Sequence, residues 1–147
     1  ELELKDIERL VDSQNTDKNY LGIGAIGYLS KAVPLNKYLL FVKQKLNIPS
    51  LRYVGKDDCK VSKIALCGGS GISLVDDAIE KRCDLLLTGD IKYHDFLTFS
   101  NKIAIVDIGH FESEQFIKQR IIEIISKKFS NFAPLFLTSE TNRVKFI

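Results

Sequence analysis

Three short apolar runs, each followed at once by a motif rich in glycine and polar residues, are the feature that most constrains the fold of this chain. The runs occupy residues 64–66, 85–87 and 103–106. Strand-like and helix-like segments alternate around them, with strands expected at 62–67, 84–88 and 103–107 and helices at 72–82, 92–100 and 112–128. This alternation predicts an α/β fold, in which a layered sheet with parallel βαβ units carries helices on both faces.

The rest of the chain adds elements on either side of these units. Apolar residues at helical spacing predict a short amphipathic first helix and a second helix that begins at Pro34. The apolar residues of the first helix are Leu4, Ile7, Leu10 and Val11, and those of the second are Leu35, Leu39, Val42 and Leu46. Further strands are expected at 21–28, 51–54, 135–138 and 143–147. The last helix has an apolar face that we expect to pack into the core, made of Phe116, Ile117, Ile121, Ile124, Ile125 and Phe129.

The composition fits a soluble globular protein, and we expect residues 1–147 to form a single α/β domain. The net charge of +2 gives no one-signed surface of the kind that binds nucleic acid. No apolar run is long enough to cross a membrane, and three cysteines without a CxxC spacing indicate a reducing compartment, so we expect a cytoplasmic protein. Because the chain contains no methionine, we also expect it to be part of a longer protein.

The first motif, CGGSG at residues 67–71, is expected to join a strand to a helix. Glycines let the backbone turn sharply and expose N–H groups, and such groups at a helix N-terminus favour anions such as phosphate. Gly68, Gly69, Ser70 and Gly71 therefore form a candidate anion-binding loop. A tight turn in which Ser70 or Ser73 caps the helix explains the same residues equally well.

The second motif, TGDIKYHD at residues 88–95, places five polar or titratable groups next to a leucine-rich strand. His94 is the most suggestive of them, because imidazole is both a metal ligand and a proton carrier near neutral pH. We therefore treat His94 as a candidate catalytic proton carrier. In the alternative reading, Asp90 caps the next helix while Lys92 and Asp95 are solvated.

The third motif, GHFESE at residues 109–114, contains the sharpest pair, His110 and Glu114. Side chains four residues apart on a helix face the same way. One imidazole and one carboxylate on adjacent turns suit a divalent metal such as zinc, manganese, iron or nickel. Alternatively, Glu114 is only a first-turn acid that the helix dipole favours. Two ligands are too few to hold an ion firmly, since such sites usually have at least three.

Taken in order, these motifs resemble the carboxyl-terminal half of the Nif-three-like family, whose members also carry the name GTP cyclohydrolase I type 2. The resemblance implies a two-part α/β protein with two divalent metal ions, assembled as a toroidal homohexamer. Of the family's metal ligands, one histidine and one glutamate have matches here, His110 and Glu114. The others, a His-His pair and an aspartate, belong to the amino-terminal half and have no match. The resemblance also implies that Asp90, Tyr93 and His94 line the same cleft.

Two functions remain open at this point. The first is a metal-dependent hydrolase that acts on a small nucleotide-like substrate, with two metal ions generating hydroxide and stabilising an oxyanion. The second is a non-catalytic metal-binding protein that serves assembly or regulation through interaction. In either case the resemblance implies that the protein is a homo-oligomer.

Overall fold

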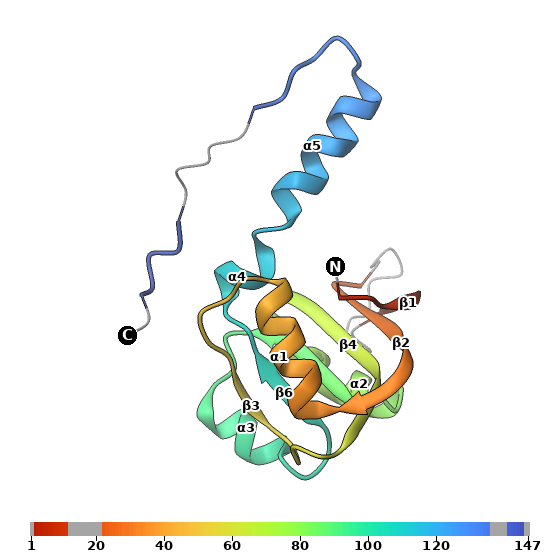
Figure 1. Cartoon of the computed structure of the whole chain (residues 1–147), viewed down its shortest axis with the longest axis vertical. Helices are drawn as coiled ribbons and strands as arrows, with labels where there is room; N and C mark the ends of the chain where they lie inside the picture. The colour runs from red at the N-terminus through yellow and green to blue at the C-terminus, as the bar shows by residue number, and fades with distance from the viewer. Residues whose placement is uncertain (1, 12–21, 136–140, 146–147) are drawn as a thin grey trace.

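The computed structural model of the chain describes residues 2–11, 22–135 and 141–145. Within these ranges the strands form a six-stranded sheet in the order β1-β2-β4-β5-β6-β3 (Figure 1). The strands are β1 (Lys5–Leu10), β2 (Gly24–Pro34), β3 (Arg52–Val54), β4 (Lys60–Ser70), β5 (Leu85–Gly89) and β6 (Ala104–Asp107). The helices are α1 (Leu35–Lys45), the 3₁₀ turn η1 (Ile72–Leu74), α2 (Val75–Glu80), α3 (Tyr93–Phe99), α4 (His110–Glu114) and α5 (Ile117–Lys128).

The centre of the sheet is parallel, as the alternation of strands and helices predicts. β4 pairs in parallel with β5, and β5 in parallel with β6, whereas β1, β2 and β3 join antiparallel. Leu87 lies beside Leu66 on one side and beside Val106 on the other, so the three motifs that follow these strands meet at one edge. The predicted α/β class with parallel βαβ units is confirmed.

Helices cover both faces of the sheet, and the alternating side chains of the central strands divide the core in two. Leu85 and Leu87 pack on the side of α1, which contributes Leu35, Leu39 and Val42. Leu86 packs on the opposite side, where α2 contributes Val75 and Ala78 and α3 contributes Phe96. Every residue of β5 is buried, which is typical of a central parallel strand with both faces covered.

The predicted first helix is wrong, because residues Lys5–Leu10 form the edge strand β1. This segment pairs antiparallel with β2, and that backbone pairing overrides the helical spacing of its apolar residues. Leu10 is fully buried on the sheet, whereas Ile7 is 61% exposed. The positions that mimic a helical stripe therefore do not face one core.

The predicted core face of the last helix is also wrong. The expected single helix is two helices, α4 and α5, with a turn at residues 115–116. α5 extends away from the sheet (Figure 1), and no residue of it is buried. Its apolar side chains therefore have no core to enter within the described part of the chain. The exposed residues of the predicted face, in α5 and directly beside it, are Phe116, Ile117, Ile121, Ile124 and Phe129.

Other differences concern the ends of elements. The predicted helix 72–82 is the short turn η1 followed by α2, and no side chain caps either, so Ser70 and Ser73 are not caps. Residues 141–145 form no strand, and 136–140 and 146–147 lie outside the described residues. Among the helices that the structure describes, none has the length and apolar character to cross a membrane.

Tyr38 gives a test of the packing beneath α1. Its hydroxyl is buried and has no hydrogen-bond partner among the described residues, and burial raises the pKa of this phenol. Because a buried polar group without a partner is destabilising, we expect Tyr38→Phe to leave the free energy of unfolding unchanged or to raise it by about 1 kcal/mol in urea unfolding. Tyr28→Phe is the matched control, because the Tyr28 hydroxyl donates to Glu8 Oε1 at 2.8 Å. A loss of stability larger for Tyr38→Phe than for Tyr28→Phe would contradict this packing.

Candidate functional site

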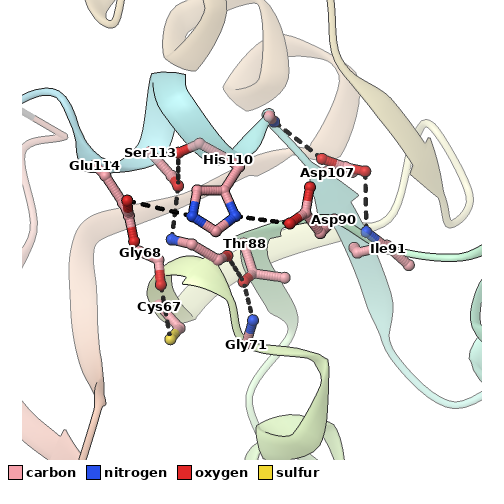
Figure 2. Close-up of polar contacts among 12 residues, drawn as sticks. Cys67, Gly68, Gly71, Thr88, Asp90, Ile91, Asp107, His110, Ser113 and Glu114 are labelled. Atoms are coloured by element: carbon pink, nitrogen blue, oxygen red, sulfur yellow. Dashed lines mark hydrogen bonds and ion pairs between the residues drawn. The ribbon is translucent and has the colours of Figure 1, made fainter.

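His110 is the centre of the candidate site, at the edge where β4, β5 and β6 end (Figure 2). Its Nδ1 lies 2.6 Å from Asp90 Oδ2, and its Nε2 lies 3.3 Å from Glu114 Oε2. The imidazole therefore stands between two carboxylates from different elements. About half of the surface of each of the three side chains is open to solvent.

The electrostatics of the site favour a positively charged imidazole in the metal-free protein. The hydrogen bond with Asp90 raises the pKa of His110 above its ordinary value, and the charges of Glu114 and Asp90 act in the same direction. Burial opposes this rise but does not cancel it. The same two carboxylates would also attract any other cation that replaces the proton on Nε2.

Asp107, the last residue of β6, fixes the backbone on both sides of this trio. Its Oδ1 accepts a hydrogen bond from Gly109 N at 2.9 Å, directly before His110. Its Oδ2 accepts one from Ile91 N at 3.1 Å, directly after Asp90. Gly109 has a φ of +88°, a left-handed conformation that glycine adopts without strain. The carboxylate of Asp107 thus fixes the backbone next to both His110 and Asp90, so that their side chains are in contact.

Arg52 on β3 completes the support of Asp107. Its Nη2 donates to Asp107 Oδ2 and to the carbonyl oxygen of Ile91, the latter at 2.8 Å. The guanidinium also lies over the ring of Phe96, 5.5 Å from its centroid. Asp107 is only 5% exposed, and a buried carboxylate requires such partners.

The end of β4 holds the other side of the site. Gly69 N donates to Ser113 Oγ at 2.8 Å, and that hydroxyl donates to the carbonyl oxygen of His110 at 2.8 Å. Thr88 is fully buried; its hydroxyl accepts from Gly71 N and donates to Gly69 O. A side chain at Gly69 would meet Glu114 Oε1 at 2.5 Å, so this glycine leaves the room that Glu114 occupies.

These residues open onto a pocket of about 670 Å³. Asp90, His110 and Glu114 line it, together with Arg52, the buried Glu112, and Lys118 of α5. The volume is in the range of sites for small molecules and cofactors. The pocket is therefore large enough for a ligand beside His110.

Comparison with known proteins identifies the family. The family model described as Duf34/NIF3 (NGG1p interacting factor 3) matches residues 1–143. This chain belongs to the NIF3 family. A protein of Staphylococcus epidermidis with the name GTP cyclohydrolase 1 type 2 homolog is 37% identical over 136 residues, which are 90% of this chain and 36% of that protein.

Solved structures agree with this membership. A crystal structure of a hypothetical protein of Staphylococcus aureus superposes with a TM-score of 0.81 at 30% identity, covering 86% of this chain and 43% of that one. A crystal structure of a Bacillus cereus protein related to NIF3 has a TM-score of 0.71 at 32% identity, covering 88% and 37%. The chain thus spans less than half the length of these NIF3-family relatives.

The structure divides the predicted site residues of this NIF3 chain into two groups. Asp90, His110 and Glu114 meet in the pocket, and Asp90 contacts His110 rather than capping α3. Tyr93 and His94 are exposed at the start of α3, because that helix turns Phe96 to the core, and neither lines the pocket. The structure does not bring these two residues to His110, and the roles assigned to them stay predictions.

The glycine motif is not the loop that we expect from the sequence. Gly68, Gly69 and Ser70 are the last residues of β4, because the strand continues past Cys67. The N–H groups of Gly69 and Gly71 already donate to Ser113 and Thr88. An anion would have to displace these hydroxyls, so anion binding by Gly68, Gly69, Ser70 and Gly71 stays a prediction with less support.

The donor set fits part of a metal site. Two ligand atoms that each lie about 2.1 Å from one ion are about 3.0 to 3.4 Å apart. The distance of 3.3 Å between His110 Nε2 and Glu114 Oε2 falls in this range. Asp90 on Nδ1 is the kind of carboxylate that orients a metal-binding histidine. Among the described residues no group of three or more His, Cys, Asp or Glu side chains could hold an ion. His110 and Glu114 are therefore an incomplete pair of ligands.

Sequence reasoning missed Asp107, Arg52 and Glu112. Asp107 and Glu112 carry a signal in the sequence, since Asp107 is an acid at the end of an apolar run and Glu112 is an acid within the third motif. The structure shows that both are buried. Glu112 Oε1 accepts a hydrogen bond from Asn142 Nδ2 at 2.6 Å, a contact between distant parts of the chain. Arg52 has no signal, because only the pairing of β3 with β6 brings it to Asp107.

Asp107 can be tested by Asp107→Asn, which preserves size but removes the charge and one acceptor. We expect the free energy of unfolding to fall by about 2 to 4 kcal/mol in urea unfolding, because Arg52 loses its charged partner and an amide nitrogen replaces one of the two oxygens that Arg52 and the two backbone N–H groups share. Asp57→Asn is the control, since Asp57 is exposed and, among the described residues, its side chain accepts a hydrogen bond from Tyr53 alone; we expect a change within about 0.5 kcal/mol. Equal effects of the two variants would contradict the role of Asp107.

Proposed function

We propose that this chain supplies part of the divalent-metal centre of a metal-dependent hydrolase that acts on a nucleotide-like substrate. The observation that carries the proposal is the arrangement of His110, whose Nε2 faces Glu114 while Asp90 engages Nδ1. When a cation takes the place of the proton on Nε2, a hydrogen bond from Nδ1–H to Asp90 leaves the Nε2 lone pair free to bind that cation beside Glu114. This is the tautomer that a metal ligand needs.

The remaining ligands are proposed to come from outside the described residues. The relatives are longer than this chain, which covers 36% of the Staphylococcus epidermidis protein. A centre of two ions, as the family resemblance implies, needs more donors than His110 and Glu114. We therefore propose that these two residues share the site with ligands from outside the described residues. The ions are proposed to be zinc, manganese, iron or nickel.

The chemistry that divalent ions supply when bound is polarisation of a substrate oxygen and acidification of water. The residues of this chain hold and orient the centre: His110 and Glu114 as ligands, and Asp90 through Nδ1 of the imidazole. The choice of a nucleotide-like substrate is supported by the name GTP cyclohydrolase 1 type 2 homolog of several relatives. A pocket of about 670 Å³ beside His110 is also compatible with a ligand of that size.

A non-catalytic metal-binding protein is the second candidate. The half-exposed pair of His110 and Glu114 is compatible with this function as well, since it needs a bound ion but no catalytic water. Metal binding without hydrolysis of any nucleotide would favour this second function. We also propose a homo-oligomer, a hexamer as the family resemblance implies. The apolar side chains that α5 exposes support it, because they are available for contact with another copy of the chain.

Three free cysteines support a cytoplasmic location.

The two histidines of the chain provide a matched test of metal binding. In equilibrium dialysis against zinc followed by elemental analysis, we expect His110→Ala to weaken binding by at least about 10-fold, because one of two ligands is lost. His94→Ala is expected to bind zinc as the parent does, since His94 lies outside the pocket. Asp90→Asn is expected to weaken binding by about 10- to 100-fold through the orientation of His110. Equal binding by His110→Ala and His94→Ala would contradict the proposal.

Two neighbouring glycines test the geometry without removing a ligand. At Gly69 a methyl group would meet Glu114 Oε1 at 2.5 Å and His110 Cε1 at 3.3 Å, whereas at Gly68 the nearest atom would be 3.6 Å away. We expect Gly69→Ala to weaken zinc binding by displacing Glu114 and to lower stability by about 1 kcal/mol, since φ is +64° there. Gly68→Ala should change neither quantity, and a similar response of both variants would count against the ligand pair.

A further inference from the structure

Arg52 reaches the same pocket as His110 and has donors that the protein does not use. A guanidinium has five N–H groups, two of them on Nη2. Both hydrogen bonds of the Arg52 side chain, to Asp107 and to the carbonyl oxygen of Ile91, leave from Nη2. Within the described residues, no hydrogen bond uses the three N–H groups on Nη1 and Nε.

The guanidinium is held in place rather than free in solution. The Asp107 carboxylate contacts it from β6, the Ile91 carbonyl from the loop after β5, and the ring of Phe96 from α3. The side chain is nevertheless 62% exposed, so its unused donors remain accessible from the pocket. A fixed donor group loses little conformational entropy when a ligand binds to it.

The pocket is lined by side chains of both charges. Asp90 and Glu114 lie against His110, whereas the cations that line the pocket, Arg52 and Lys118, come from β3 and α5. Asn142, also in the lining, adds an amide from the end of the chain. A ligand in this pocket would thus find both carboxylates, or the ions they bind, and N–H donors in the lining.

We propose that Arg52 binds the phosphate group of the ligand that occupies this pocket. Three N–H donors on a positively charged group suit the three oxygens and near-dianionic charge of phosphate, and the lining of the pocket also includes Lys118 as a second cation. This inference rests on the proposed function for the identity of the pocket, but not on metal binding. It assigns phosphate recognition to β3 instead of the glycine residues at the end of β4.

The test is a phosphate titration of the metal-free chain, with Arg52 observed directly by NMR through its Nε–H signal. The probes are inorganic phosphate, adenosine 5′-monophosphate and adenosine, each at constant ionic strength. Arg52→Gln removes the guanidinium, and Arg52→Lys keeps a charge beside Asp107 so that a folded variant is available. Arg120→Gln is the matched control, because Arg120 is 63% exposed and also paired with a carboxylate, that of Glu123, but does not line the pocket.

We expect saturable shifts of the Arg52 signal with a phosphate-bearing probe and none with adenosine. Binding should weaken at least about 10-fold in Arg52→Gln and in Arg52→Lys, and stay unchanged in Arg120→Gln. Tighter binding of the nucleotide than of inorganic phosphate would support a phosphate ester as ligand; the reverse order would support free phosphate. No shift of Arg52 with either probe, or equal weakening in Arg120→Gln, would overturn the inference. Because zinc binding is measured separately on His110→Ala, a failure here is distinct from a failure of the metal site.

Discussion

The carboxylate of Asp107 is the group on which the rest of the site depends. It is buried at the end of β6 and is shared by the N–H groups of Gly109 and Ile91 and by Arg52. Burying a charge is unfavourable unless it is paired and hydrogen-bonded, so all these partners must be in place together. The consequence is that the turn before His110, the turn after Asp90 and the strand that carries Arg52 are fixed relative to one another.

This single constraint joins the fold to the proposed chemistry. The parallel strands bring the motifs to one edge, but the distance from His110 to Asp90 depends on the two turns that Asp107 holds. On the other side, Ser113 and the bare backbone of Gly69 fit α4 against the end of β4, which leaves room for Glu114. The imidazole is thus oriented by Asp90 while Nε2 faces Glu114, an arrangement suited to a shared metal ligand.

The central sheet and the pair of His110 and Glu114 could be predicted from the sequence, because both depend on local patterns. Apolar runs with polar ends predict β4, β5 and β6, and a spacing of four residues predicts two side chains on one face of a helix. The prediction of a helix in the first segment is wrong because the pairing of β1 with β2 overrides the helical spacing of its apolar residues. The apolar face of α5 has the pattern of a core helix, yet periodicity does not say which surface covers it.

The contact between Arg52 and Asp107, which supports the site, could not be predicted either, because it also depends on how distant strands pair. Arg52 and Asp107 are 55 residues apart, and only the sheet order makes them neighbours. His94 shows the opposite case, since a motif rich in titratable residues suggests a site, whereas the packing of α3 through Phe96 directs His94 to solvent. Local motifs therefore identify candidates for this site, and long-range pairing decides which of them meet.

The most direct measurement of the central claim is anomalous X-ray diffraction from zinc-soaked crystals of this chain, recorded above and below the zinc edge. The account predicts a zinc peak within bonding distance of His110 Nε2 and a Glu114 oxygen, with Asp90 still on Nδ1. A peak at His94 or at the cysteines with none beside His110 would contradict it.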